Sequence, residues 1–188
     1  MSPTNPKASP VRLRCISNTD AEAITALLQG DVDLALQTAS LPIPYTLEDA
    51  RTFLSTADPR HVFAVIADDQ LVGMAGMIGV AEPIEIGYWI GRKHWGKGYA
   101  TCAVALLLQK ARDRGASRIV AEVFPGNIAS MRVLEKNGFR RRGEVVRDLP
   151  KRGGQRRLIH FETQGSGALK KRSSQSTPNC ASSGASKR

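Results

Sequence analysis

The chain has 188 residues, of which 41% are hydrophobic and 23% charged, and this length and composition are typical of one globular domain. The formal net charge of +10 is concentrated in two stretches: residues 140–157 hold eight Lys or Arg against two acids, and residues 165–188 hold five against none. The rest of the chain is close to neutral, which excludes a nucleic-acid-binding surface that extends over the whole domain.

The two ends of the chain differ in composition from its centre. Residues 1–9 are polar, proline-rich and without the apolar run of a secretory signal, so they predict a flexible N-terminus and a cytoplasmic protein. Residues 165–188 are basic, rich in Gly and Ser and free of aromatic residues, which predicts a disordered tail. The longest low-polarity run, residues 71–81, is too short and too glycine-rich to cross a membrane. We therefore expect one domain over residues 10–164.

The first half of this domain predicts strands and helices in turn. Residues 11–16 read as a short strand, and the polar run that starts at Ser17 supplies N-cap candidates for a helix up to Gln29. A second helix is expected over residues 47–55. The segments "HVFAVIA" and "LVGMAGMIGV" predict two strands joined by a turn at "DDQ".

The second half continues with a strand, a helix, a strand, a helix and two strands. The strand over residues 84–90 leads to a helix over residues 99–114, and the strand over 117–124 leads to a helix that Asn127 caps. Gly115 and Gly138 follow the two helices as C-terminal stops. The last two strands, about residues 139–147 and 156–162, are joined by the basic loop "PKRGG". This order predicts an α+β domain with a mostly antiparallel sheet.

The segment "GRKHWGKGYAT", residues 91–101, joins the fourth of these strands to the helix that starts at Tyr99. Successive backbone N–H groups in a glycine-rich loop at a helix N-terminus form an anion site. Gly96, Gly98 and the small Ala100 would let a phosphate approach the backbone. Positive charge nearby comes from Arg92, Lys93 and Lys97. The alternative is a tight turn with solvated lysines.

Two common phosphate motifs do not fit this loop. The dinucleotide fingerprint G-x-G-x-x-G would need a glycine at Thr101. The P-loop spacing of Gly91, Gly96 and Lys97 is present, but Gly98 stands where the magnesium-binding Ser or Thr is required. The three cysteines and three histidines are scattered without ligand spacing, so no metal site is expected.

The residues around the loop match a third motif. "WGKGYA" after "GYWI" resembles the acyl-CoA-binding loop of the GNAT acetyltransferases, and "NIASMRVLEKNGF", residues 127–139, resembles the second half of the same signature. The two segments most closely resemble the subgroup that includes the ribosomal-protein alanine acetyltransferases. The resemblance covers about residues 10–164. It implies a single GNAT-like domain whose mostly antiparallel, mixed sheet is splayed at its centre, with helices on both faces.

The resemblance also implies acetyl-CoA as the co-substrate. Its pantetheine arm would enter the gap between the strands 84–90 and 118–124 and pair with the backbone of Tyr88, Trp89 and Ile90. Its pyrophosphate would rest on the loop residues Gly96, Lys97, Gly98, Tyr99, Ala100 and Thr101. The Asn127 side chain would bind the arm from the other side of the gap. A plain helix cap is the alternative role of Asn127, and both roles could hold together.

One residue departs from the family pattern. Many GNAT enzymes have a Tyr four positions before the helix-ending glycine, where it protonates the departing thiolate, but here that position is Leu134. Ser130, one helical turn earlier, matches the serine of the alanine-acetylating subgroup. The resemblance therefore implies that Ser130 hydrogen-bonds the sulfur. The alternative is an ordinary small residue on a helix surface.

Two carboxylates are candidates for the general base. An α-amine of pKa ~8 is about 10% neutral at pH 7 and a lysine only about 0.04%, so a base would assist attack by either amine. Glu85 and Glu122 interrupt the two apolar strands beside the proposed gap, where a carboxylate is costly unless it is solvated or paired. Either could be the base, and the other would form a salt bridge. No nucleophile lies beside an activating base in the sequence, which favours direct transfer without a covalent enzyme intermediate.

The sequence thus predicts an acetyl-CoA-dependent N-acetyltransferase that acts on a primary amine, with a protein N-terminal α-amine, including that of a ribosomal partner, as the favoured acceptor. The first alternative is a small-molecule amine such as a polyamine or an aminoglycoside. The second is a non-catalytic acyl-CoA-sensing or nucleic-acid-binding module. Direct nucleic-acid binding is not expected, because residues 140–157 contain no aromatic residue for base stacking. The segment "QTASLPIPYTLED" and the basic hairpin are the candidate acceptor walls.

Overall fold

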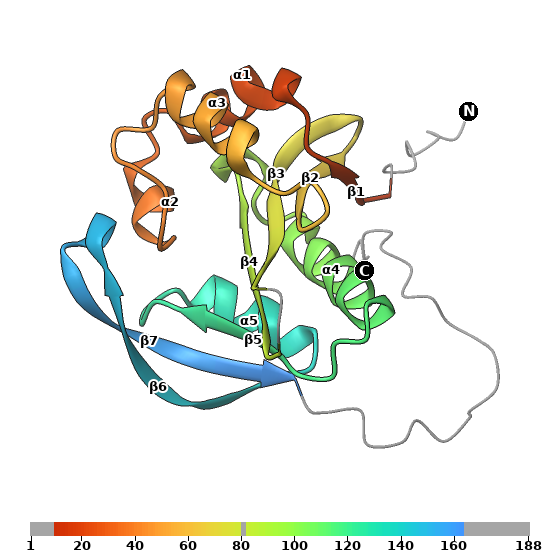
Figure 1. Ribbon diagram of the computed structural model, residues 1–188, viewed down its shortest axis with the longest axis vertical. Helices are drawn as coiled ribbons and strands as arrows, with labels where there is room; N and C mark the ends of the chain where they lie inside the picture. The colour runs from red at the N-terminus through yellow and green to blue at the C-terminus, as the bar shows by residue number, and fades with distance from the viewer. Residues whose placement is uncertain (1–9, 80–81, 164–188) are drawn as a thin grey trace, which may run out of the picture.

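The computed structural model describes residues 10–79 and 82–163 (Figure 1). The strands are β1 (Arg12–Cys15), β2 (Val62–Ala67), β3 (Gln70–Ile78), β4 (Ile84–Ile90), β5 (Ile119–Val123), β6 (Phe139–Leu149) and β7 (Gly154–Thr163). The helices are α1 (Ala21–Leu28), α2 (Val32–Leu36), α3 (Leu47–Thr56), α4 (Tyr99–Asp113) and α5 (Ile128–Lys136), with short 3-10 turns η1 (Asn18–Asp20), η2 (Arg92–His94) and η3 (Pro150–Arg152). The predicted flexible N-terminus, residues 1–9, and the predicted disordered tail, residues 165–188, lie outside the described residues.

The seven strands form one sheet in the order β1-β2-β3-β4-β5-β7-β6 (Figure 1). All neighbouring strands are antiparallel except β4 and β5, which are parallel. The ladder between β4 and β5 has only two pairs, Ile84 with Ile119 and Glu85 with Val120, although β4 continues to Ile90. The strands therefore separate after Glu85, and the mixed sheet is split at its centre, which confirms the predicted α+β architecture.

Side chains of β4 alternate between two cores, one on each face of the sheet. Ile86 and Ile90 belong to the larger cluster, which contains Leu107 of α4 and Leu134 of α5. Trp89 packs against the second cluster, which contains residues of α1, α2 and α3. Helices thus cover both faces, and residues on successive positions of β4 face different helices.

Local signals explain most helix boundaries, and one helix was missed. Ser17 and Thr46 each form a capping box, with Asp20 and Asp49 respectively, which starts η1 and α3. The helix α2 was not predicted from the sequence. Asp31 caps it with a hydrogen bond to the amide of Leu34 (3.0 Å), but its five residues are too few to display a helical period.

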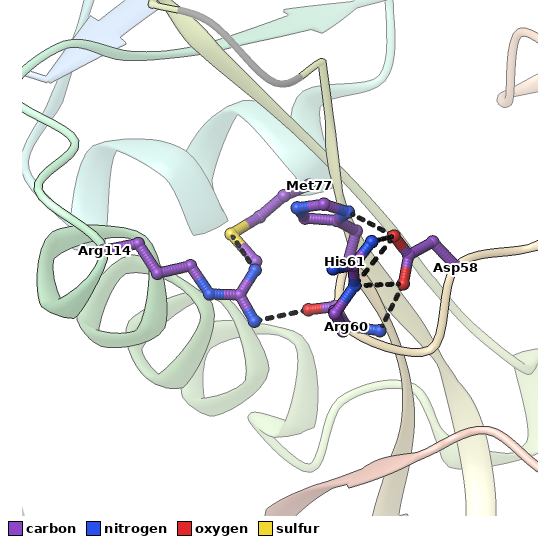
Figure 2. A network of polar contacts seen from close by, with 5 residues as sticks. All are labelled: Asp58, Arg60, His61, Met77 and Arg114. Carbon is purple, nitrogen blue, oxygen red and sulfur yellow. Dashed lines mark hydrogen bonds and ion pairs between the residues drawn. The ribbon is translucent and has the colours of Figure 1, made fainter.

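The far end of α4 is tied to the start of β2 by Arg114 (Figure 2). Its Nη2 donates to the backbone oxygen of Arg60 at 2.5 Å, and its Nη1 lies 4.0 Å from Sδ of Met77. Asp58 holds the same turn through Nη2 of Arg60 (2.8 Å) and Nδ1 of His61 (3.2 Å). Because the other end of α4 follows the glycine loop, this anchor helps to fix the direction in which the helix N-terminus points.

Candidate active site

The phase of the pairing between β3 and β4 decides which backbone groups of β4 face the gap. The amide of Gly91 donates to the oxygen of Val72 at 2.9 Å. Backbone groups alternate along an antiparallel ladder, so Trp89, two residues earlier, also turns its backbone toward β3. The backbone groups of Tyr88 and Ile90 point the other way, into the space that β5 has left. Two of the three residues predicted to pair with a pantetheine arm therefore present backbone groups to the gap.

Trp95 closes the turn that follows β4. Its indole Nε1 donates to the oxygen of Ile90 at 2.6 Å, and the guanidinium of Arg92 lies 5.0 Å from the centre of its ring. Arg92 also binds Asp31 (2.8 Å) and Asp33 (3.0 Å), and it holds the pKa of Asp31 below its usual range. The expectation that Arg92 adds free positive charge for a phosphate was wrong, because two aspartates already neutralise it.

The glycine loop ends at an uncapped helix N-terminus. Gly98 is the N-cap residue of the 15-residue helix α4 and offers no side chain to its first amides. The amides of Tyr99, Ala100 and Thr101 belong to the first turn, where no intrahelical acceptor exists. Gly96 and Gly98 have φ of +76° and +79°, and a Cβ on either would meet no atom within 4 Å. The loop therefore needs glycine for its left-handed backbone, and the space above it is open to an anion.

His94 lines the same region with an unsatisfied polar atom. Its residue is 9% exposed, and its Nε2 is buried with no hydrogen-bond partner within residues 10–79 and 82–163. Burial, then the nearby Lys93 and Lys97, lower the pKa of His94. His94 thus carries, beside this loop, a buried ring nitrogen that no described residue pairs with.

Ser130, Asn127 and Tyr88 form a polar group at the start of α5. Asn127 caps the helix, and its Oδ1 accepts from the amide of Ser130 at 3.0 Å. The Oγ of Ser130 lies 2.9 Å from Oη of Tyr88, and the same Oη donates to the Ser130 backbone oxygen at 3.2 Å. Burial raises the pKa of Tyr88 to about 12. Leu134, at the position of the family's tyrosine, is fully buried and has no hydroxyl. The phenol beside this helix turn is that of Tyr88, on β4.

Sequence reasoning assigned only the backbone of Tyr88 to the site and missed its hydroxyl. The alternation of β4 does predict that Tyr88 points to the same face as Ile86 and Ile90. The partner on α5, 42 positions away, has no local signal in the sequence.

The two candidate bases lie in different electrostatic settings. Glu122 is tightly paired: its side chain is 6% exposed and accepts from Nε (2.9 Å) and Nη2 (2.6 Å) of Arg147 on β6. Nδ1 of His160 lies 3.6 Å from the same carboxylate. Glu85 has no hydrogen-bond or ion-pair partner in the part of the chain that the structure describes, and burial and then the charge of Glu122 raise its pKa. Its half-buried carboxylate is thus free to take a proton.

The carboxylates and the hydroxyls lie on opposite faces of the split sheet. Glu85 alternates with Ile86 and Tyr88 on β4, so it faces the side of α1, α2 and α3. Glu122 lies on that side too, because its neighbours Ala121 and Val123 belong to the other core. The gap between β4 and β5 is therefore flanked by acids on one face and by hydroxyls on the other.

One cavity of about 1340 Å³ joins both faces. It is lined by all three predicted catalytic residues and by every predicted co-substrate residue except Lys97: Glu85, Glu122 and Ser130, and Tyr88, Trp89, Ile90, Gly96, Gly98, Tyr99, Ala100, Thr101 and Asn127. Its other walls include the segment 37–42, helix α3 and the end of β6. The described residues contain no cluster of three or more His, Cys, Asp or Glu that could hold a metal ion.

Known proteins resemble this chain in sequence and in fold. The family model described as "Acetyltransferase (GNAT) domain" matches residues 11–140. The probable N-acetyltransferase YjcK of Bacillus subtilis (strain 168) is 32% identical over an alignment of 152 positions, which covers 73% of this chain and 84% of that protein. The chain belongs to the GNAT acetyltransferase family. As a GNAT protein with N-acetyltransferase relatives, it is an acyltransferase.

Solved structures share the fold of this GNAT domain. Mycobacterium smegmatis RimJ in complex with CoA-disulfide superposes with a TM-score of 0.73 at 24% identity, covering 88% of this chain and 90% of that one. The ribosomal-protein-S5-alanine acetyltransferase from Vibrio fischeri has a TM-score of 0.68 at 21% identity, covering 84% and 94%. Among the helices of residues 10–79 and 82–163, none combines the length and the apolar run that a membrane span requires.

Proposed function

We propose that this GNAT protein transfers the acetyl group of acetyl-CoA directly to the N-terminal α-amine of a protein. The observation that carries the proposal is the split between β4 and β5, which has an unpaired carboxylate on one face and a paired set of hydroxyls on the other. The structural likeness to a ribosomal-protein-S5-alanine acetyltransferase supports a protein N-terminus, including one on a ribosomal partner, as the acceptor. We place the reaction in the cytoplasm and the domain over residues 10–164.

The chain's own backbone would hold the co-substrate. Tyr88 turns its backbone groups into the gap, and Ile90 turns its amide there, since its oxygen already accepts from Trp95; a pantetheine arm would pair with these groups as an added strand does. The backbone of Trp89 faces β3, so its contribution would be its side chain. The pyrophosphate would be bound by the loop Gly96–Thr101 and the free amides of α4, with Lys97 as the nearby charge. Asn127 would add a polar contact at the start of α5.

Glu85 is the base that we propose, and the charge of Glu122 helps to raise its pKa. A base needs an available lone pair, and the carboxylate of Glu122 already accepts three hydrogen bonds from Arg147. Glu85 has no such partner, and the charge of Glu122 together with burial raises its pKa, which brings it closer to neutral pH and makes it a better proton acceptor. The two glutamates thus share a face but have different roles.

Ser130 and Tyr88 act on the leaving sulfur in this mechanism. The amine nitrogen attacks the thioester carbonyl, the C–N bond forms, the C–S bond breaks, and Glu85 receives the proton that the amine loses. The thiolate is stabilised by a hydrogen bond from Ser130. When Tyr88 donates its one proton to Oγ of Ser130 (2.9 Å) and not to the Ser130 backbone oxygen, the serine proton is free to point to the sulfur. Thiols are more acidic than a phenol of pKa about 12, so the hydroxyls stabilise the thiolate more than they protonate it.

The experiment is release of free thiol from acetyl-CoA by the purified full chain with a panel of acceptors. The panel contains N-terminal peptides, polyamines and aminoglycosides, and mass spectrometry identifies the acetylated nitrogen. Acetylation of the peptide α-amine, lost in Glu85→Gln and retained in Glu48→Gln, is the expected result; Glu48 lines the same cavity but is exposed. Activity on polyamines or aminoglycosides alone would show that the acceptor is a small-molecule amine and not a protein N-terminus. Tight acetyl-CoA binding without thiol release from any acceptor would instead indicate a sensor.

A further inference from the structure

Arg152 is a buried charge at the tip of the β6–β7 hairpin, in the 3-10 turn η3. It is only 7% exposed, yet no carboxylate pairs with it among residues 10–79 and 82–163. Burial lowers its pKa, and no neighbouring charge opposes that shift. A buried guanidinium without a counter-charge is costly, so its hydrogen bonds must offset the loss of water.

All but one of the hydrogen bonds that Arg152 makes to described residues go to a single distant segment; the exception runs from Nη1 to the adjacent Lys151 oxygen. Its Nη2 donates to the backbone oxygens of Ala35 and Leu41, both at 2.6 Å, and its Nε donates to that of Thr38 at 2.8 Å. These carbonyls belong to the last turn of α2 and the segment after it, and all lie more than 100 positions away in sequence. In Figure 1 the hairpin tip, drawn in blue, lies next to α2. The rigid guanidinium reaches these three carbonyls from two separate nitrogens, whereas a lysine would have to donate to all of them from one.

The two segments that Arg152 joins are both walls of the main cavity. One wall contains residues 37–42, and the other contains Asp148, Leu149 and Lys151. Asp49, at the start of α3, lines the same cavity as Lys151. Arg152 itself is not among the lining residues. It therefore acts on the cavity only through the two segments that it connects.

Part of the basic hairpin thus has a structural role that the sequence did not indicate. The sequence predicted the hairpin, residues 140–157, only as a candidate acceptor wall with high positive charge. Arg152 is instead buried on backbone oxygens, and Arg147 is paired with Glu122. The matched family range ends at residue 140, so this contact joins a segment inside the family match to one outside it.

We propose that Arg152 is a positioning residue for the acceptor wall: it holds the segment 37–42 against the hairpin tip so that the acceptor enters a preformed cavity. The proposal rests on the proposed function in one respect, that the amine acceptor binds on the face that carries Glu85. The glycine loop, which would bind the co-substrate, lies at the N-terminus of α4 and shares no hydrogen bond with Arg152.

The test is a series of Arg152→Lys and Arg152→Met in the full chain, with Arg114→Met as the matched control. Arg114 also donates to a distant backbone oxygen (Figure 2), and neither it nor Arg60 lines the cavity; of the residues that it contacts in that figure, Met77 does. Arg152→Met should raise the acceptor KM about tenfold or more, because an unanchored wall occupies the binding conformation only a fraction of the time. Arg152→Lys should give an intermediate value. The Kd for acetyl-CoA and kcat at saturating acceptor should stay within about twofold of wild type.

Two further measurements separate positioning from loss of stability. Amide hydrogen exchange of residues 37–42 should accelerate in Arg152→Met and not in Arg114→Met. Free guanidinium at non-denaturing concentrations should restore the acceptor KM in an Arg152→Ala variant, since the ion can occupy the vacated site. An unchanged acceptor KM in Arg152→Met would overturn the proposal, as would a parallel loss of acetyl-CoA affinity and acceptor affinity. If no acceptor reacts with wild-type protein, the proposed function fails, while the exchange data still decide whether Arg152 holds this wall.

Discussion

The Oη of Tyr88 lies 2.9 Å from the Oγ of Ser130, although the two residues are 42 positions apart and come from β4 and α5. This contact brings a phenol to the helix turn in which Leu134 replaces the tyrosine of many GNAT enzymes. The two hydroxyls are hydrogen-bonded to each other, and both residues line the cavity. If this pair of hydroxyls stabilises the leaving thiolate, the loss of either one should remove the same stabilisation of the thiolate.

Tyr88→Phe should lower kcat about tenfold and leave the Kd for acetyl-CoA unchanged, because it removes one hydroxyl and no backbone group. Ser130→Ala should cost at least as much, and the double variant should be little worse than Ser130→Ala. The comparison of kcat in the three variants is the measurement. The control is Tyr45→Phe, a buried tyrosine that lines the cavity and makes no hydrogen bond to the described residues. Independent, multiplying losses would show that Tyr88 does not act through Ser130.

Glu85→Gln should reduce turnover by about 10² or more, since it keeps size and polarity and removes the proposed base. The deficit should shrink as the pH approaches the acceptor's own pKa of ~8, where solvent supplies neutral amine. In wild type, kcat/KM should fall as Glu85 becomes protonated, and its raised pKa moves this fall to a higher pH than for an ordinary glutamate. A pH–rate profile of both proteins checks this. Near-wild-type turnover of Glu85→Gln at pH 7 would remove Glu85 as the base.

Stability should respond to the two glutamates with opposite signs. Burial raises the pKa of Glu85, so the folded state binds its proton more tightly than the unfolded state does. Stability is therefore full below the unfolded pKa of about 4.3 and is lost as pH rises through the folded pKa. Glu85→Gln should raise Tm at neutral pH and leave it nearly unchanged in acid. Glu122→Gln should lower Tm at neutral pH, because it leaves Arg147 without its counter-charge. Thermal melts between about pH 4 and pH 8 check both signs.

Gly98→Val should weaken acetyl-CoA binding at least about tenfold while the domain stays folded. Its φ of +79° disfavours any side chain, and the loop would lose the conformation that turns its amides to the phosphates. The matched control is Gly115→Val at the other end of α4, where φ is +88° and a Cβ also meets no atom within 4 Å. Both variants should lose similar thermal stability. Calorimetric titration should separate them, and equal affinities for acetyl-CoA would exclude the loop from the site.

Much of the secondary structure follows from the sequence alone, because its signals are local. The strand Ile84–Ile90 was predicted with its observed bounds, and the helices that begin at Leu47 and Tyr99 were predicted within one residue of their observed ends. Alternation, caps and stop glycines act over a few positions, so neighbouring residues are sufficient to set them. The glycine loop before Tyr99 was predicted as an anion site, which stays a prediction, and the structure adds positive φ as a reason for its glycines.

Only the tertiary structure decided which groups are free and which are committed. The sequence could not choose between Glu85 and Glu122, because the choice depends on Arg147, which the sheet order brings to Glu122 from 25 positions away. Tertiary structure also sets two other contacts. Tyr88 meets Ser130 beside the gap where β4 and β5 separate, and Arg152 is buried because the β6–β7 hairpin packs against the segment after α2. Hydrogen bonds and ion pairs depend on distances of a few ångströms between residues far apart in the chain. Local pattern does not encode those distances, so packing of the split sheet determines the chemistry of the site.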